Sequence, residues 1–363
     1  MRKEEVKKWI DDCHKKHKKA AIYFCSFVPV EILEAAGFQT LQITHLEENG
    51  DLYPEELPKN VCPIVRECCE ICESGVLEQA DLIIAESSCD GKKKMFELLK
   101  DQSKVYYYQV PQGEEQEYVL PLIASESRYL IKMLEQRFGI TVTDEAIRKA
   151  ANDTNRQRAS AMNLLAVQQQ VPPCAWGMEV YEKLQENMKL PTSEERIAAN
   201  EKVREEFLGR EEKVPETAPR ILLTGCPIGG VYQKIIEIVE KNGGVVVCFE
   251  NCECIKSNIR FTDVKKDDII ASLAECYQNT ACAIMTPNQK RKKLLEQLVT
   301  SYQIAGILDI HLQPCHAYTV EKYSVERHFS QQGIPYAAIE TGYSDADKAQ
   351  LSTRIAAFLE ILQ

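Results

Sequence analysis

The feature that most constrains this fold is a strand–loop–helix pattern that occurs in both halves of the chain. Short apolar runs of strand type cover residues 20–24, 80–85 and 105–110 in the first half, and 220–224, 245–249, 281–285, 306–310 and 336–340 in the second. Helical patterns separate most of these runs, and such alternation favours a parallel sheet with helices on its faces. We therefore predict an α/β fold with two Rossmann-like domains, each with a doubly wound, mostly parallel sheet.

The middle of the chain differs from both halves because its patterns are helical. Long helical patterns cover residues 117–138, 143–170 and 193–207, and the prolines and charges of 211–219 are typical of a linker. We predict an N-terminal α/β domain at 1–113, a helical insert and linker at 114–215, and a C-terminal α/β domain at 216–363. A length of 363 residues leaves room for a core in each α/β domain.

Composition excludes several classes of protein. Lys and Arg number 44 against 55 Asp and Glu, a formal charge of −11, which disfavours nonspecific binding to nucleic acid or anionic lipid. No apolar run approaches the roughly 20 residues of a membrane span, and the run at 20–24 is too short for the core of a signal peptide. We expect a cytoplasmic protein whose ligand is a small molecule, with neither nucleic acid nor membrane as a partner.

Cysteine is unusually frequent, with 15 residues in the chain. Thiols stay reduced in the cytoplasm, so packing, reactivity or metal binding are better explanations than disulfides. Six cysteines share one context, because each follows a predicted strand or opens a helix, where open α/β sheets bind ligands. There are three in each half: Cys25, Cys62, Cys89, Cys226, Cys252 and Cys315.

Several thiolates from separate loops suit a soft metal or an iron–sulfur cluster. Structural zinc sites normally use close CxxC pairs, but the one such pair, Cys69 with Cys72, lies in a predicted helix. A single cysteine in a reducing compartment more often packs as a small apolar residue, whereas six in matching loops favour ligation. The six cysteines are therefore our candidate metal ligands, and helix N-termini beside them would stabilise a negative cluster.

The other cysteines have simpler interpretations. We read Cys68, with Cys69 and Cys72, as residues of the core or of the layer behind the ligands. Packing inside helices or strands is predicted for the rest: Cys13, Cys174, Cys248, Cys276 and Cys282. Cys254 is different, because Cys252-Glu253-Cys254 leaves open which of its two sulfurs is the ligand.

Nucleotide-binding motifs are missing from the sequence. The loop at 225–230 follows a strand but does not give G-x-G-x-x-G, and no P-loop occurs, so ATP binding by this chain is not supported. Lys92, Lys93 and Lys94 are typical of a solvated helix start. Alternatively, they attract an acidic substrate or a donor protein, or offset the charge of a cluster.

Acid–base candidates are few. His45, His311 and His316 lie near predicted strand ends, where a histidine more often packs than ligates. His316, beside Cys315, could deliver a proton to a reduced substrate. Glu250 at a strand end is a weaker catalytic candidate.

Four stretches carry a resemblance to a known group of enzymes. They are FVPVEILEAAG at 27–37, LPKNVCP at 57–63, CDGKKK at 89–94 and the loop at 224–230. On these residues the chain resembles the 2-hydroxyacyl-CoA dehydratase and benzoyl-CoA reductase superfamily over nearly its whole length, with CDGKKK the most specific piece. Within that superfamily it is most similar to the double-cubane cluster proteins.

The resemblance implies a cofactor and partners. Double-cubane proteins hold two cubanes joined by a bridging sulfide, an [8Fe–9S] cluster, within one subunit, whereas the dehydratases use fewer cysteines on each of two different subunits. Cys25 and Cys226 are the additional loop cysteines that separate these branches. The resemblance also implies a homodimer that receives electrons from a separate ATP-hydrolysing iron–sulfur activator protein. One departure is Cys254, which stands where the family typically has glycine.

Three hypotheses about function follow. The favoured one is a low-potential iron–sulfur reductase of small substrates, with a double-cubane cluster on the six cysteines. The alternative is the [4Fe–4S] subunit of a 2-hydroxyacyl-CoA dehydratase, a lyase that needs a second, non-identical subunit. The third is a non-enzymatic iron–sulfur carrier.

Overall fold

The structure is a computed structural model that describes residues 2–44, 57–58, 60–226 and 230–362. The chain forms two compact units, each made of two segments. The first unit contains Met1–Asn155 and Arg260–Pro287, and the second contains Arg156–Ile259 and Asn288–Gln363. These limits follow packing, whereas the divisions at 113/114 and 215/216 follow the texture of the sequence and stay a prediction.

The first unit is built on a four-stranded parallel sheet with the order β2-β1-β3-β4. Its strands are β1 (Lys19–Tyr23), β2 (Phe38–Gln42), β3 (Leu82–Glu86) and β4 (Val105–Tyr108). Every residue of β3 is buried, which explains its continuous apolar sequence, because strands inside a parallel sheet have both faces covered. The chain reverses its direction of winding between β1 and β3, so loops after these two strands diverge to opposite sides.

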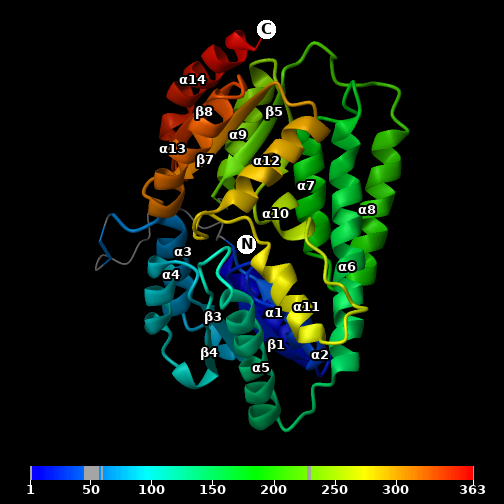
Figure 1. The fold of residues 1–363 in the computed structure, drawn as a ribbon, viewed down its shortest axis with the longest axis vertical. Coiled ribbons are helices and arrows are strands. Elements are labelled where there is room, and N and C mark those ends of the chain that lie inside the picture. Colours follow the sequence, from blue (N-terminus) through cyan, green and yellow to red (C-terminus); the bar gives the residue numbers. More distant parts are fainter. Residues whose placement is uncertain (1, 45–56, 59, 227–229, 363) are drawn as a thin grey trace. The chain divides into compact units, whose positions relative to one another are not determined.

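Helices from both of its segments cover the sheet of the first unit. They are α1 (Lys3–Lys15), α2 (Val30–Ala35), α3 (Pro63–Glu73), α4 (Asp90–Met95), α5 (Val119–Phe138) and α11 (Ile269–Gln278), and the unit boundary falls within α6 (Asp144–Leu165). Figure 1 shows α11, in yellow, beside α5, in teal, and the two helices pack together although they are far apart in sequence. Ile269 and Leu273 of α11 belong to the same hydrophobic core as Leu82 of β3.

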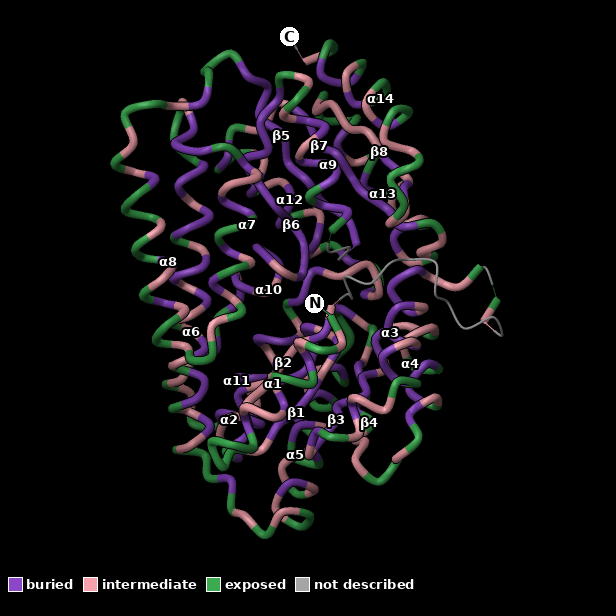
Figure 2. The backbone as a smooth tube through the Cα atoms, turned by 180° about the vertical axis from the view of Figure 1, so that it is seen from behind, coloured by how far each residue is buried: buried purple, intermediate pink, exposed green. Residues whose placement is uncertain are grey.

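The second unit repeats this architecture. Its parallel sheet has the order β6-β5-β7-β8, with β5 (Arg220–Gly225), β6 (Val245–Glu250), β7 (Gly306–Leu312) and β8 (Tyr336–Thr341). All residues of β5, β6 and β7 are buried, as the purple strands of Figure 2 show. The helices of this unit are α7 (Gly177–Met188), α8 (Ser193–Leu208), α9 (Gly230–Lys241), α10 (Ile255–Asn258), α12 (Gln289–Ser301), α13 (His316–Ser330) and α14 (Lys348–Ile361).

The predicted α/β class with two domains and parallel sheets is confirmed, but one predicted strand is wrong. Residues 281–285 form a loop, in which the Cys282 amide donates to Thr280 and the Met285 amide donates to Cys282. The extended contact nearby is a single bridge between Gly113 and Thr286. Among the described helices, none combines the length and the apolar character needed to cross a membrane.

Candidate functional site

The six predicted cysteines occupy equivalent places in the two units. Cys25 follows β1, Cys62 opens the helix after β2, and Cys89 follows β3; we call these three the first triad. The second triad is Cys226 after β5, Cys252 after β6 and Cys315 after β7. The two sheets have the same strand order, and Cys25 and Cys89 directly follow β1 and β3 as Cys226 and Cys315 follow β5 and β7. Cys252 directly follows β6, whereas Cys62 is separated from β2 by a longer stretch of chain.

Three triad cysteines stand directly before a helix. Cys62 is the N-cap residue of α3, Cys89 of α4 and Cys315 of α13. The first turn of a helix leaves backbone N–H groups unpaired within the helix, and its dipole favours negative charge there. These three side chains therefore stand where backbone N–H groups are available to a bound group.

Two members of the first triad, Cys25 and Cys89, lie near Lys92 of α4. The Lys92 ammonium donates to the carbonyl of Phe24, next to Cys25, at 2.7 Å, and it lies within electrostatic reach of the thiols of Cys25 and Cys89. Burial raises the pKa of the Cys89 thiol, the backbone N–H and the ammonium of Lys92 oppose that rise, and Cys62 adds to it. Cys89 is thus near both Lys92 and Cys62, and Lys92 is near Cys25.

Cys226 of the second triad is fixed between two neighbouring strands. Its sulfur accepts a hydrogen bond from the Leu312 amide at 3.2 Å and donates to the Ile310 carbonyl at 3.6 Å. Gly225 before it has φ +124°, and a Cβ there would stand 2.0 Å from the Ile310 carbonyl oxygen. Only glycine therefore lets β5 approach β7 closely enough to place Cys226 in this way.

Cys252 and Cys254 differ in their surroundings. Cys254 is wholly buried, receives a long hydrogen bond from the Gln185 amide of α7 at 3.9 Å, and has a pKa raised well above the usual value by burial. Cys252 keeps some exposure, 8%, in the turn after β6. Cys252 is thus the more accessible of the two thiols, and Cys254 is packed against α7.

Glu250 belongs to a buried polar row across three strands. In register, Glu250 of β6 faces Thr224 of β5, which faces Asp309 of β7. The Thr224 hydroxyl donates to Glu250 at 2.5 Å, the Lys256 ammonium lies 3.2 Å from Glu250, and the Arg291 guanidinium donates to Thr224 at 2.8 Å. Glu250 thus lies within a network of hydrogen bonds and ion pairs that joins the three strands.

The three candidate histidines differ in where they lie. His311 is wholly buried with Nε2 at 2.9 Å from Asp309, as expected of a packed residue. Burial favours the neutral carboxyl of Asp309, but His311 and Arg291 prevail and lower its pKa. His316 is exposed in the first turn of α13, directly after Cys315, and His45 lies outside the described residues.

The thiols of each triad are donors of the kind that an iron–sulfur cluster uses. Within the described ranges no three His, Cys, Asp or Glu side chains surround a position for a single metal ion. Around a cluster, by contrast, each thiolate binds a different iron, and N–H groups donate to sulfur, as Leu312 does here. Asn251, next to Cys252, is wholly buried, and among the described residues neither polar atom of its amide has a hydrogen-bond partner. Buried amides normally have partners, so this side chain also suits a bound group.

Comparison with protein families agrees with this geometry. The family described as "2-hydroxyglutaryl-CoA dehydratase, D-component" matches residues 25–362. The chain belongs to this D-component family. It is thereby a member of the 2-hydroxyacyl-CoA dehydratase and benzoyl-CoA reductase superfamily, which confirms the resemblance drawn from the sequence.

Relatives of this D-component protein are subunits of enzymes. A putative dehydratase subunit, YjiM, of Escherichia coli K12 is 36% identical, covering 93% of this chain and 90% of the relative. The (R)-phenyllactyl-CoA dehydratase beta subunit of Clostridium sporogenes is 23% identical, covering 93% and 90%. A subunit of the benzoyl-CoA reductase of Thauera aromatica is 22% identical, covering 89% and 85%. The chain is therefore related to subunits of both dehydratases and a reductase.

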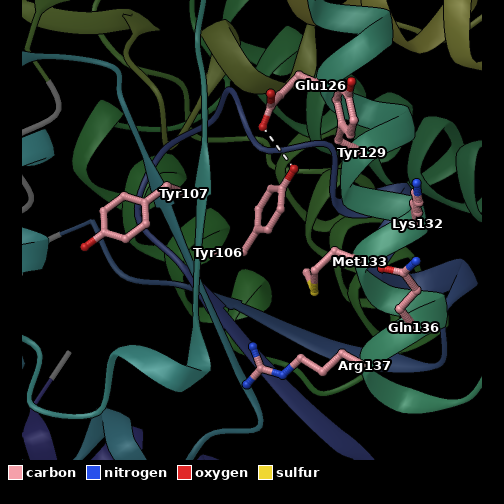
Figure 3. Close-up of a pocket in the computed structure, with 8 residues that line it drawn as sticks. All are labelled: Tyr106, Tyr107, Glu126, Tyr129, Lys132, Met133, Gln136 and Arg137. Atoms are coloured by element: carbon pink, nitrogen blue, oxygen red, sulfur yellow. Dashed lines mark hydrogen bonds between the residues drawn. The ribbon is translucent and has the colours of Figure 1, made fainter.

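A cavity of about 640 Å³ opens elsewhere on the first unit of the D-component protein, and none of the six cysteines lines it. It lies between β4 and α5, and Figure 3 shows the Tyr106 hydroxyl donating to Glu126, at 3.0 Å. Its lining residues are Tyr106, Tyr107, Glu126, Tyr129, Lys132, Met133, Gln136 and Arg137.

Two cysteines that were predicted to pack inside helices or strands lie elsewhere. Cys174 and Cys282 lie in loops and not inside a helix or strand. Cys282 is half-buried and close enough to Cys89 for its charge to raise the pKa of that thiol. The apolar run at 281–285 suggested a strand and so concealed a thiol beside the first triad.

Proposed function

We propose that this D-component protein is a low-potential iron–sulfur reductase of small substrates. The supporting observation is the repetition of a cysteine triad after the same three strands of two equivalent sheets. A dehydratase-type subunit with one [4Fe–4S] cluster needs one such set, whereas this chain has two. In the proposal each triad binds one cubane of a double-cubane cluster, which supplies single electrons.

The protein's own residues would prepare the thiols and their surroundings. The ligands are Cys25, Cys62 and Cys89 in the first unit and Cys226, Cys252 and Cys315 in the second. The exposed His316 would deliver a proton to the reduced substrate, and Glu250, in the polar row across β6, β5 and β7, is the weaker acid–base candidate. The resemblance adds two partners to the proposal, a second copy of the chain and an ATP-hydrolysing iron–sulfur activator protein.

A second candidate function is favoured by the relatives. Two of them are described as dehydratase subunits, and one of these is 36% identical. In this alternative the chain carries one [4Fe–4S] cluster of a 2-hydroxyacyl-CoA dehydratase, which removes water from a CoA thioester. That enzyme would need a second, non-identical subunit.

Iron and sulfide content per chain tests these functions. The protein is produced with added iron, purified without oxygen, and examined by electron paramagnetic resonance. About eight irons per chain support the double-cubane reductase, and about four support the dehydratase subunit. Zinc, or no metal after reconstitution, contradicts both. Turnover that requires the activator and ATP, either reduction of a substrate or dehydration of a CoA thioester, separates both enzymes from a carrier, which would instead transfer its cluster to an apo-protein.

A further inference from the structure

The three lysines after Cys89 differ in their surroundings, and only one of them faces the triad. Lys92 is 13% exposed in its side chain, whereas Lys93 and Lys94 are exposed and Lys94 pairs with Glu97 at 2.5 Å. Gly91 allows this placement, because a Cβ there would approach Val65 of α3 to 3.0 Å. The start of α4 therefore packs against α3 and directs Lys92 inward.

Two buried acceptors hold the Lys92 ammonium. It donates to the Phe24 carbonyl at 2.7 Å and lies 3.3 Å from the carboxylate of Glu86, the last residue of β3. Glu86 has no exposed side-chain surface, and Ser88 contacts its carboxylate at 3.4 Å. Burial opposes the charge of Lys92, but the Glu86 carboxylate beside the ammonium outweighs it and raises the pKa of Lys92, so the group stays charged.

The ammonium does more than neutralise Glu86. Of the charged groups that act on the thiols of Cys89 and Cys68, Lys92 has the largest effect on their pKa values. The ion pair is therefore oriented with its positive end toward the triad. A positive charge held among ligands favours the more electron-rich state of the group that they bind, and burial strengthens the effect because the local dielectric constant is low.

We propose that Lys92 is a positioning residue that sets the reduction potential of the cluster bound by the first triad. The carboxylate of Glu86, its ion-pair partner, has the opposite effect on that potential. This inference rests on the proposed function, because it needs a cluster on Cys25, Cys62 and Cys89. It assigns opposite effects to the two partners of one ion pair. Loss of the ammonium lowers the potential, and loss of the carboxylate raises it.

The experiment is a redox titration of the iron-loaded protein, followed by electron paramagnetic resonance. The variants are Lys92→Met, which keeps the length of the side chain without its charge, Lys92→Arg, Glu86→Gln and the neighbouring exposed control Lys93→Met. Iron content and thermal unfolding are measured for each. We expect a more negative midpoint for Lys92→Met, a more positive one for Glu86→Gln, and a wild-type value for Lys92→Arg and Lys93→Met.

The measured midpoints either support or overturn the role of Lys92. Unchanged midpoints in iron-loaded Lys92→Met and Glu86→Gln overturn it, as do shifts of the same sign. If Lys92→Met does not fold or load iron, Glu86→Gln decides alone, and a midpoint that does not rise overturns the inference. Wild-type protein without iron contradicts the proposed function itself, whereas a loaded wild type with unshifted variants contradicts only the role of Lys92.

Discussion

At the scale of single residues, neighbours of identical type have different roles because of helical geometry. Each residue of a helix is rotated by about 100° from the one before it, so only one of Lys92, Lys93 and Lys94 can face the sheet. The sequence predicts a lysine-rich helix start next to a candidate ligand. It does not show which lysine turns inward, because that depends on how α4 packs against Val65 of α3.

The Cys89 thiol gives the first prediction. Cys89→Ala removes a soft ligand from the first triad, so we expect the variant to assemble no stable cluster, and we expect its iron content to fall to near zero. Cys13→Ala is the matched control, since Cys13 is a buried thiol of α1 outside both triads. Full iron content in Cys89→Ala would contradict its assignment as a ligand.

The Glu240 carboxyl gives a prediction about pH. Burial raises its pKa from 4.5 to about 7, although the amides of Gly177 and Met178 oppose the rise, and the Gly177 amide donates to it at 2.7 Å. Because the pKa is higher in the folded state, wild-type stability from this group is full below about 4.5 and is lost as pH rises through about 7.

Glu240→Gln removes this dependence. We expect the stability of the variant relative to wild type to increase between about pH 5 and pH 8, by on the order of 2 kcal/mol in the free energy of unfolding. Denaturant unfolding across this range measures it. Glu237→Gln, an exposed change on the same helix, is the control. If the difference in the free energy of unfolding between Glu240→Gln and wild type does not change with pH, the pKa of Glu240 is not raised in the folded protein.

At the scale of elements, apolar runs predicted most strands to within two residues at either end. The run 245–249 corresponds to β6 (Val245–Glu250), for example. The strand β2 was missed, because Phe38–Gln42 is short and half polar, and its pairing with β1 stabilises it. The prediction for residues 281–285 was wrong in the opposite sense, because a strand was predicted where the structure has a loop. An apolar sequence can fill a buried loop as well as a strand.

The contact between α7 and β6 gives a prediction at this scale. Gly177 begins α7, and a Cβ on it would stand 2.2 Å from the Val246 carbonyl oxygen. Since backbone atoms can move little, we expect Gly177→Ala to reduce the free energy of unfolding by roughly 2 kcal/mol or more. Thermal or denaturant unfolding measures this loss.

Gly230→Ala is the matched control, because Gly230 also begins a helix, α9, and the nearest described atom to an added Cβ is the Gln233 Oε1, at 4.0 Å. We expect this substitution to be neutral or slightly stabilising, since alanine favours helices. Equal losses in the two variants would show that the approach of α7 to β6 is not what constrains Gly177.

At the scale of the whole molecule, the repeated strand order was predictable, whereas the composition of the units was not. Sequence texture indicates a continuous N-terminal domain, but Arg260–Pro287 packs in the first unit. The reason is tertiary: α11 covers α5 and contributes Ile269, Leu273 and Ala274 to the core. No local pattern in the sequence assigns a helix to a sheet that lies so many residues earlier.

This discontinuity predicts a selective effect of a charge in α11. Leu273 is wholly buried in the core of the first unit, so Leu273→Asp forces a carboxylate into apolar surroundings and should unfold that unit. Hydrogen exchange should then show loss of protection in β1 and β3 and protection retained in β5 and β7. Ala271→Asp, half-buried in the first turn of the same helix, is the control and should leave both sheets protected. Equal loss in both sheets would mean that the two units unfold as one, and no loss would mean that α11 does not support the first sheet.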